Sequence, residues 1–376
     1  MRCLLVAVAF STIAASIPAT PAPVAKPFGK LPDGRDVHLY TLEDPSGFRA
    51  DIINYGGIIV RLMAPDRAGR LADVTLGYDD LESYLERGRN FGALVGRVAN
   101  RIAEGRFTID GRSYTLPVNT QSGGMSSNIH GGQRGFAKVL WRAEPTVYDG
   151  RPALRLRYTA ADGEEGFPGR LEVAVLYSIS DGRGLRIDYT ATTDKPTLIN
   201  LTNHAYFNLK GEGEGDILDH ELTVHAKHYT PNTPGLYPTG EIAEVGETPF
   251  DFRTPKKIGA RITEPHPQLQ LARGYDHNFV LDAGGGALAL ASVAYEPTSG
   301  RVLETLTTEP GVQLFTANSM DDPRGGKAGK PYIRHGGFCL ETQHFPNSIN
   351  IPAFPSTILR PGGEFRSTTV YRFSVR

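Results

Sequence analysis

The sequence predicts an all-β protein, folded as one large and mostly antiparallel β-sandwich. The chain of 376 residues contains 43 glycines and 27 prolines, so turns are frequent and long uninterrupted helices are not expected. From about residue 30 onward, short runs of alternating apolar and polar residues recur, which is the pattern of half-buried strands. Strands do not alternate with long helices, and this argues against a doubly wound or barrel α/β fold.

The N-terminal residues 1–22 are predicted to be a signal peptide rather than part of the fold. Arg2 supplies a positive charge, and the apolar run Leu4–Ala15 ends in small residues, as a cleavage site requires. The run is too short for a comfortable transmembrane span. We therefore expect an exported protein, periplasmic or secreted, that has no membrane partner after cleavage, with residues 23–376 as a single domain.

Charge and cysteine content narrow the class of protein further. Lys plus Arg is 40 and Asp plus Glu is 41, so the formal net charge of −1 gives no indication of a nucleic-acid partner. Cleavage of the signal removes Cys3 and leaves only Cys339, so the mature chain has no internal disulfide.

The strands can be placed along the chain from their turns. Phe48–Asn54 and Ile58–Met63 are apolar runs on either side of Tyr55-Gly56-Gly57, and Asp110-Gly111 is a strong hairpin signal between two further runs. The remaining expected strands, in order, are Arg106–Ile109, Arg112–Leu116, Ala153–Thr159, Leu171–Ser178 and Gly184–Thr192.

Helix is expected in one short stretch, around Asp79–Arg87. Gly284-Gly285-Gly286 predicts a flexible loop, because it lacks the strand and helix that flank a phosphate-binding loop.

Five segments combine charged residues with glycine, asparagine and aromatic residues. This mixture suits a sugar site, where polar groups bind hydroxyls and rings cover the apolar faces of the pyranose. The segments are Gly96–Ile102, Asn128–Gly132, Asn203–Leu209, Gly274–Phe279 and Glu341–Asn347.

Each of these residues also has a purely structural interpretation. His130 precedes two glycines and can be a turn residue, and His204 can be a hydrogen-bonded core histidine. Asp276 and Asn278 can form a turn after Gly274, as such residues often do. Arg101 can be a solvated strand residue, and strand alternation after Phe338-Cys339-Leu340 can place Glu341 on an exposed face.

No metal or cofactor is expected. The chain has no H-E-x-x-H motif and retains one cysteine after cleavage. His220, His225 and His228 are interpreted as surface residues, and no nucleophile-elbow motif indicates a catalytic serine.

Taken together, the five segments resemble the aldose 1-epimerase (galactose mutarotase) family. The resemblance covers nearly the whole mature chain, from Leu31-Pro-Asp-Gly34 and Asn54-Tyr-Gly-Gly57 to Leu359-Arg-Pro-Gly362, and it includes Pro249-Phe-Asp-Phe252. It implies the family's supersandwich, a large antiparallel β-sandwich with the sugar in a cleft on one sheet. One departure is Asn347, where many relatives are expected to have aspartate.

The resemblance also implies roles for individual residues. Glu341 would be the general base and His204 the general acid, with His130 assisting near the ring oxygen. Arg101 and Asp276 would bind sugar hydroxyls, and Asn100 and Gln313 are weaker candidates for the same task.

The implied reaction is the interconversion of the α and β anomers of a free aldose such as galactose or glucose. A base takes the proton of the anomeric hydroxyl while an acid protonates the ring oxygen, and the same groups then close the ring on the other face. With ordinary pKa values, turnover would rise as Glu341 loses its proton and fall as His204 loses its own.

Three alternatives remain open at this point. They are a non-catalytic sugar-binding protein on the same fold, a hexose-phosphate mutarotase, and a glycosidase that uses Asp276 and Glu341 as its carboxylate pair. The sequence leaves open the preferred aldose and whether the protein is a monomer or a homodimer.

Overall fold

The computed structural model describes residues 21–181 and 183–376. Most of the predicted signal peptide, residues 1–20, lies outside them. Among the described residues, no helix is both long enough and apolar enough to cross a membrane.

The largest element is a nine-stranded sheet in which every neighbouring pair of strands is antiparallel. Its long strands alternate buried and exposed residues, because one face packs into the core. In spatial order the strands are β12 (Arg142–Tyr148), β13 (Arg151–Ala160), β14 (Leu171–Ser180), β15 (Gly184–Thr193), β28 (Phe365–Val375), β24 (Arg301–Thr307), β23 (Ala289–Tyr295), β18 (Glu221–Val224) and β21 (Lys256–Lys257).

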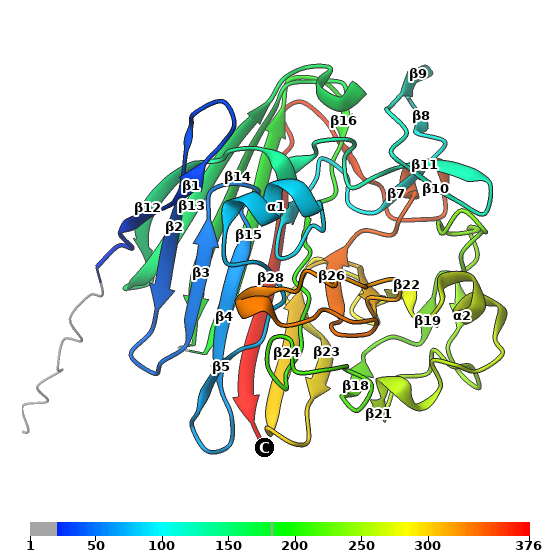
Figure 1. Ribbon diagram of the computed structural model, residues 1–376. Helices are drawn as coiled ribbons and strands as arrows, with labels where there is room; N and C mark the ends of the chain where they lie inside the picture. Colours follow the sequence, from blue (N-terminus) through cyan, green and yellow to red (C-terminus); the bar gives the residue numbers. More distant parts are fainter. Residues whose placement is uncertain (1–20, 182) are drawn as a thin grey trace, which may run out of the picture.

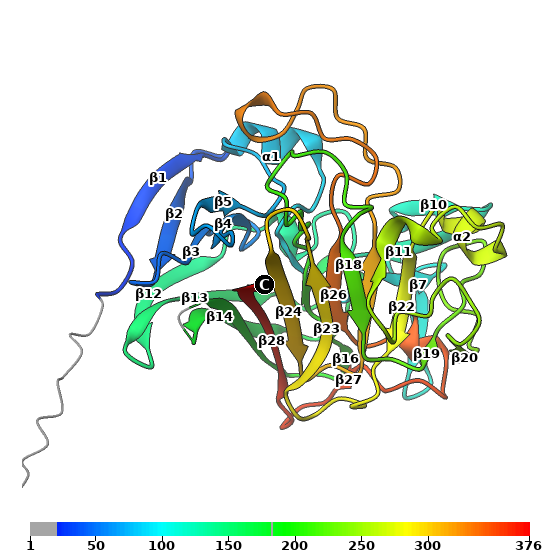
Figure 2. The same ribbon diagram turned by 90° about the horizontal axis from the view of Figure 1, so that it is seen from below.

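A five-stranded antiparallel meander covers one end of this sheet, and both views show it as a second layer over β12–β15 (Figures 1 and 2). Tyr40, Leu42 and Ile52 of the meander share a buried core with Leu156 and Val175 of the large sheet. Burial of these side chains gives the sandwich its main stabilisation, at roughly 25 cal/mol per Å² of apolar surface. The strands are β1 (Ala25–Lys30), β2 (Asp36–Glu43), β3 (Arg49–Ile53), β4 (Ile59–Pro65) and β5 (Leu71–Asp73).

A second five-stranded sheet packs on the other half of the large sheet. Its residues Leu314 and Leu340 belong to the shared core. The hydroxyl groups of Thr342 and of Thr369 in β28 form a hydrogen bond of 2.6 Å between the two sheets. In order, the second five-stranded sheet contains β20 (Ala243–Glu244), β19 (His228–Tyr229), β22 (Asp276–Val280), β25 (Gly311–Phe315) and β26 (Cys339–Gln343).

Short strand pairs and turns connect these layers (Figure 1). They are β6 (Leu94–Val95) with β17 (Thr202–Asn203), β16 (Thr197–Leu198) with β27 (Ile358–Leu359), β8 (Arg106–Ile109) with β9 (Arg112–Thr115), and the sheet of β10 (Thr120–Ser122), β11 (Met125–Ile129) and β7 (Arg101–Ala103).

The structure confirms the all-β sandwich and most of the expected elements. At the β8–β9 hairpin, Asp110 and Gly111 both have positive φ, as the predicted tight turn requires. Helix α1 (Leu81–Arg87) begins after Asp80, whose carboxylate accepts a hydrogen bond from the Ser83 N–H (2.8 Å).

Two sequence expectations were wrong. A second helix, α2 (Pro267–Ala272), was missed because it is six residues long and is capped by the imidazole of His266, which is an unusual N-cap. His220 is fully buried rather than on the surface, and its Nε2 accepts a hydrogen bond from the Leu209 N–H (2.9 Å). His225 is exposed, as expected, and His228 is half-buried.

Candidate active site

A cavity of about 230 Å³ lies where the second five-stranded sheet meets the connecting segments. Its volume is below the roughly 300–1,000 Å³ of sites for drug-sized ligands, so it has room for one small polar molecule. It brings together all five segments that the sequence singles out. The lining residues are Gly88, Arg89, Asn90, Asn100, Arg101, Ile129, His130, His204, Tyr206, Asp276, Phe315 and Glu341.

Glu341 reaches the cavity through strand alternation. Its neighbours Leu340 and Thr342 face the core, so Glu341 points to the opposite face of β26. That face is covered rather than open to solvent, and Glu341 is only 2% exposed. Strand alternation therefore predicts the face of β26 that carries Glu341, but this face is enclosed rather than exposed.

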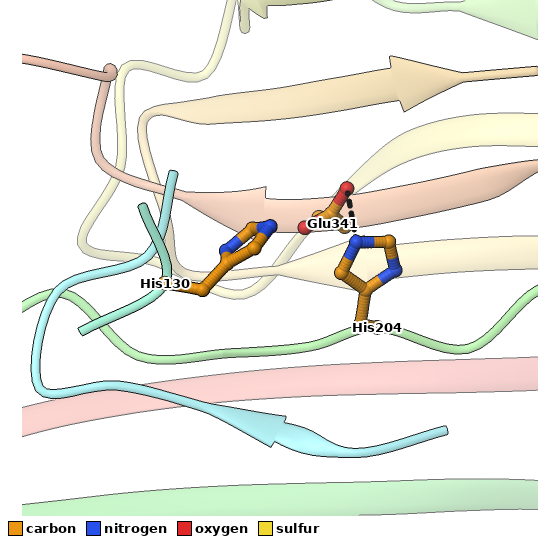
Figure 3. Close-up of side chains that lie close together, drawn as sticks. All are labelled: His130, His204 and Glu341. Carbon is orange, nitrogen blue, oxygen red and sulfur yellow. Dashed lines mark ion pairs between the residues drawn. The ribbon is translucent and has the colours of Figure 1, made fainter. Parts of the chain in front are cut away.

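His204 is fixed on three sides. Its backbone N–H donates to Ala93 O (2.9 Å), and its ring stacks on Tyr206 with centroids 4.9 Å apart. Its Nδ1 lies 3.4 Å from Cys339 Sγ, and its Nε2 lies 3.7 Å from Glu341 Oε1 (Figure 3). This contact places a titratable nitrogen next to the buried carboxylate.

His130 approaches the same point from the turn after β11. Its ring centroid is 5.2 Å from that of His204, and Figure 3 shows both rings beside Glu341. The turn is very tight, because a Cβ on Gly131 would lie 2.0 Å from Gly96 O, so glycine is required there. The Asn100 N–H donates to His130 Nδ1 (3.2 Å) and fixes the ring.

Arg101, Asp276 and Gln313 form a polar group at one side of the cavity. Arg101 Nη1 lies 3.8 Å from Asp276 Oδ2, and Gln313 Nε2 donates to Asp276 Oδ1 (2.7 Å). Gln313 does not line the cavity itself, so its contact with the site runs through Asp276. Neither Asp276 nor Asn278 forms a turn, because both lie in β22.

Asn347 holds the backbone of this group from outside the cavity. Its N–H donates to Arg101 O (2.9 Å), and its Oδ1 accepts from the Ala103 N–H (3.1 Å). The position that departs from the family pattern therefore holds strand β7, which carries Arg101, and does not line the cavity.

Burial dominates the electrostatics of the site. It raises the pKa of Glu341 well above its usual range, the charge of Asp276 raises it further, and Arg101 opposes both. Burial lowers the pKa of His204 to about 4 and also lowers that of His130. In the sugar-free cavity both histidines are therefore uncharged near pH 7.

Several polar atoms around the cavity have no hydrogen-bond partner among the described residues. They include Glu341 Oε2, Arg101 Nε and Gln313 Oε1. Buried polar groups are almost always satisfied, so these atoms are the ones that a polar ligand or ordered water would bind.

The three groups His130, His204 and Glu341 are close enough to suggest a metal centre, with possible ligand atoms within 4.8 Å of one another. The hydrogen bonding does not fit one. Because the Asn100 N–H occupies the lone pair of His130 Nδ1, the neutral ring carries its proton on Nε2 and has no free nitrogen.

Six lining residues are not among the candidate residues: Gly88, Arg89, Asn90, Ile129, Tyr206 and Phe315. Of these, Ile129 and Tyr206 belong to segments that the sequence singles out. Tyr206 and Phe315 supply aromatic surface, and their ring centroids are 6.0 Å apart. Arg89 adds a cation. The polar and glycine-rich run Gly88-Arg-Asn-Phe-Gly92 carries the same kind of signal as the five segments, and it could have been found by that criterion.

Comparison with known proteins agrees with this arrangement. The chain is 45% identical to the galactose mutarotase of Rattus norvegicus over 349 residues, covering 93% of this chain and 97% of the rat protein. It is 34% identical to the aldose 1-epimerase of Escherichia coli K12, covering 91% and 96%.

Two solved structures share the fold. The aldose epimerase homologue from C. elegans has a TM-score of 0.81 at 28% identity and covers 90% of this chain and 99% of its own. The galactose 1-epimerase from Lactobacillus acidophilus has a TM-score of 0.81 at 25% identity and covers 95% and 99%. The sequence matches the aldose 1-epimerase family over residues 38–372, and the chain belongs to that family.

Proposed function

We propose that this protein is an aldose 1-epimerase that interconverts the α and β anomers of free aldoses such as galactose and glucose. The observation that carries the proposal is the contact between a buried carboxylate and a buried imidazole, Glu341 Oε1 and His204 Nε2, in a cavity sized for one sugar. Family membership supports the same reaction.

In the proposed mechanism, Glu341 takes the proton of the anomeric hydroxyl and His204 gives a proton to the ring oxygen. The bond between C1 and the ring oxygen then breaks, which yields the open-chain aldehyde. Rotation about C1–C2 presents the other face, and the two residues return their protons in reverse as the ring closes. His130, with its proton on Nε2, acts as a hydrogen-bond donor near the ring oxygen.

The other residues hold the sugar. Arg101 and Asp276 bind hydroxyls, Asn100 contributes from the cavity wall, and Gln313 orients the Asp276 carboxylate. Asp276 has a partner at each oxygen, Gln313 Nε2 and Arg101 Nη1, so it suits binding better than the proton transfer that a glycosidase would need.

The pKa shifts determine which form of the pair reacts. Burial disfavours both charged forms, so the proton that the pair shares rests mainly on Glu341 in the empty site. The reacting form, with Glu341 ionised and His204 protonated, carries the same number of protons. The pH limits of turnover therefore belong to the pair, and removal of either group should change them.

We further propose that the protein is exported after cleavage of residues 1–22. This proposal rests on the sequence of the N-terminal segment alone. Intact-mass analysis of the exported protein should show a mature N-terminus between about Ile17 and Lys26, and retention of Met1 would contradict it.

Polarimetry on freshly dissolved single anomers tests the main proposal. The enzyme should speed the approach to the equilibrium rotation for α-D-galactose or α-D-glucose, and the rate should survive chelator treatment and dialysis. If none of the aldoses in a panel of pure anomers is accelerated, the proposed function is wrong.

A further inference from the structure

We propose that Cys339 is a positioning residue for His204, and that its thiol sets which ring nitrogen of His204 carries the proton facing the sugar. The catalytic part of this inference, an effect of Cys339 on turnover, rests on the proposed function. Its structural part, the tautomer of His204, can be measured without any assay of activity.

The contact is direct and enclosed. Cys339 Sγ lies 3.4 Å from His204 Nδ1, and the cysteine is fully buried. Cys339 and Glu341 are two residues apart on β26, so both side chains point to the same face of the strand. One strand therefore contacts both nitrogens of His204, with the thiol at Nδ1 and the carboxylate at Nε2.

The chemistry of a thiol suits a histidine that gives up and regains a proton. Burial keeps the pKa of the Cys339 thiol well above its usual range, so the sulfur retains its hydrogen. With neutral His204, the S–H donates to Nδ1, which leaves the ring proton on Nε2, facing Glu341 and the cavity. With protonated His204, the Nδ1–H donates to the sulfur instead.

Alternative partners would favour one state of the ring. A carboxylate at Nδ1 would stabilise the charged ring, and a carbonyl would hold the proton on Nδ1 and leave Nε2 without one. A thiol is a weak donor and a weak acceptor, so it can hydrogen-bond to the neutral or the charged ring with little preference. The titratable and charged groups around His204 are Glu341 and Cys339 from β26, Asp276 from β22, Arg101 from β7, His130 from the turn after β11, Arg89 from the segment after α1, and Tyr206 from its own segment.

Two variants separate positioning from packing. Cys339→Val keeps the volume and apolar character but removes both hydrogen-bonding modes, whereas Cys339→Ser keeps a donor and an acceptor. Loss of one hydrogen bond of this kind typically changes a rate about two- to tenfold. We expect Cys339→Val to lower kcat by about that factor with little change in KM, and Cys339→Ser to restore most of it.

Nitrogen NMR of ¹⁵N-histidine-labelled protein gives the decisive readout, with the His204 signals assigned by their loss in His204→Asn. Wild type and Cys339→Ser should show the Nε2–H tautomer at pH 7, and Cys339→Val should show a mixture.

Either of two results would overturn the proposal. One is a predominant Nδ1–H tautomer in the wild type, and this measurement decides the matter even if Cys339→Val fails to fold. The other is a folded Cys339→Val protein with the tautomer and kcat of the wild type. Failure of the proposed function is a different result, because it would appear as absent mutarotation in a wild-type protein whose tautomer is still Nε2–H.

Discussion

Two clusters of buried ionisable groups among the described residues differ in their hydrogen bonding. The active-site cluster is His130, His204 and Glu341. The Lys327 cluster contains Asp73, Glu212, Lys327 and Tyr332. Both clusters contain ionisable groups that are almost fully enclosed, such as Glu341 at 2% exposed and Lys327 at 4%.

The Lys327 cluster is satisfied from within. Lys327 Nζ donates to Asp73 Oδ2 (2.6 Å) and to Thr75 O (2.8 Å), and the Glu212 carboxylate accepts from the Tyr332 hydroxyl and from the Lys327 N–H. In the active-site cluster, Glu341 Oε2 has no partner among the described residues, and Oε1 is 3.7 Å from the nearest imidazole nitrogen. Enclosure alone therefore does not mark a functional site, whereas an enclosed carboxyl oxygen that lacks a partner distinguishes the active-site cluster from the Lys327 cluster.

The largest expected effect comes from Glu341→Gln, which keeps the shape of the side chain but cannot accept the anomeric proton. Turnover should fall by about 10²–10⁴-fold, the usual value of positioned acid–base catalysis. Thermal stability should change little, because the protonated carboxyl of the empty site and the amide that replaces it are both neutral and of similar size. Polarimetry and a thermal melt on one preparation test both parts. Near wild-type mutarotation in a folded variant would remove Glu341 from the mechanism.

The opposite outcome is expected for Lys327→Met. Loss of one partner from a buried pair typically costs about 3–5 kcal/mol, so the free energy of unfolding should fall by that amount while the folded protein keeps its kcat. Lys257→Met is the matched control, because Lys257 pairs with Asp219 at the surface and such pairs contribute about 1 kcal/mol or less. Urea unfolding measures both. Equal effects in the two variants would mean that enclosure does not distinguish the pairs.

Intermediate effects are expected where the active site binds rather than reacts. Arg101→Ala and Asp276→Asn each remove a charge-assisted hydrogen bond to the sugar, worth about 1.5–3 kcal/mol, so kcat/KM should fall by roughly 10- to 150-fold. Steady-state kinetics with galactose checks this. Unchanged constants in both variants would make the pair structural, like that of Lys327 and Asp73.

The smallest effect is expected for Asn347→Asp, which introduces the residue anticipated in many relatives. The Asn347 side chain acts as an acceptor, from the Ala103 N–H and from Asn350 Nδ2, and a carboxylate keeps both bonds. Turnover should therefore stay within about twofold, less than the weakest hydrogen-bond effect above. A loss of tenfold or more would show that strand β7 depends on the neutral amide.

Much of the fold was accessible from local sequence patterns. The Asp110-Gly111 turn, the period-two strands such as β14, and the Asp80-capped helix are each determined by residues close together in the chain. The His266 cap of α2 was not, because its signal is a single imidazole, and the burial of His220 depends on packing against distant Phe338.

Part of the active site could also be predicted from local sequence patterns. Six of the seven candidate residues line one cavity, and Gln313 contacts it through Asp276. Two properties needed three-dimensional structure: the covered face that encloses Glu341 and the contact of Cys339 with His204. Enclosure also exchanges the residues expected to set the acid and alkaline limits of turnover, because it raises the pKa of Glu341 and lowers that of His204.

The pH dependence of kcat for wild type, Glu341→Gln and His204→Asn tests the central claim most directly. As pH falls through about 4, His204 takes up a proton while Glu341 still holds its own, so the pair carries two protons. Glu341 then cannot act as a base, and wild-type turnover should fall. As pH rises through the elevated pKa of Glu341, the pair loses its only proton and turnover should fall again. The residual activity of Glu341→Gln should therefore lack the alkaline limit, and that of His204→Asn should lack the acid limit near pH 4. An alkaline limit near pH 6.5 that disappears in His204→Asn, as for an exposed histidine, would contradict this account, as would identical limits in all three proteins.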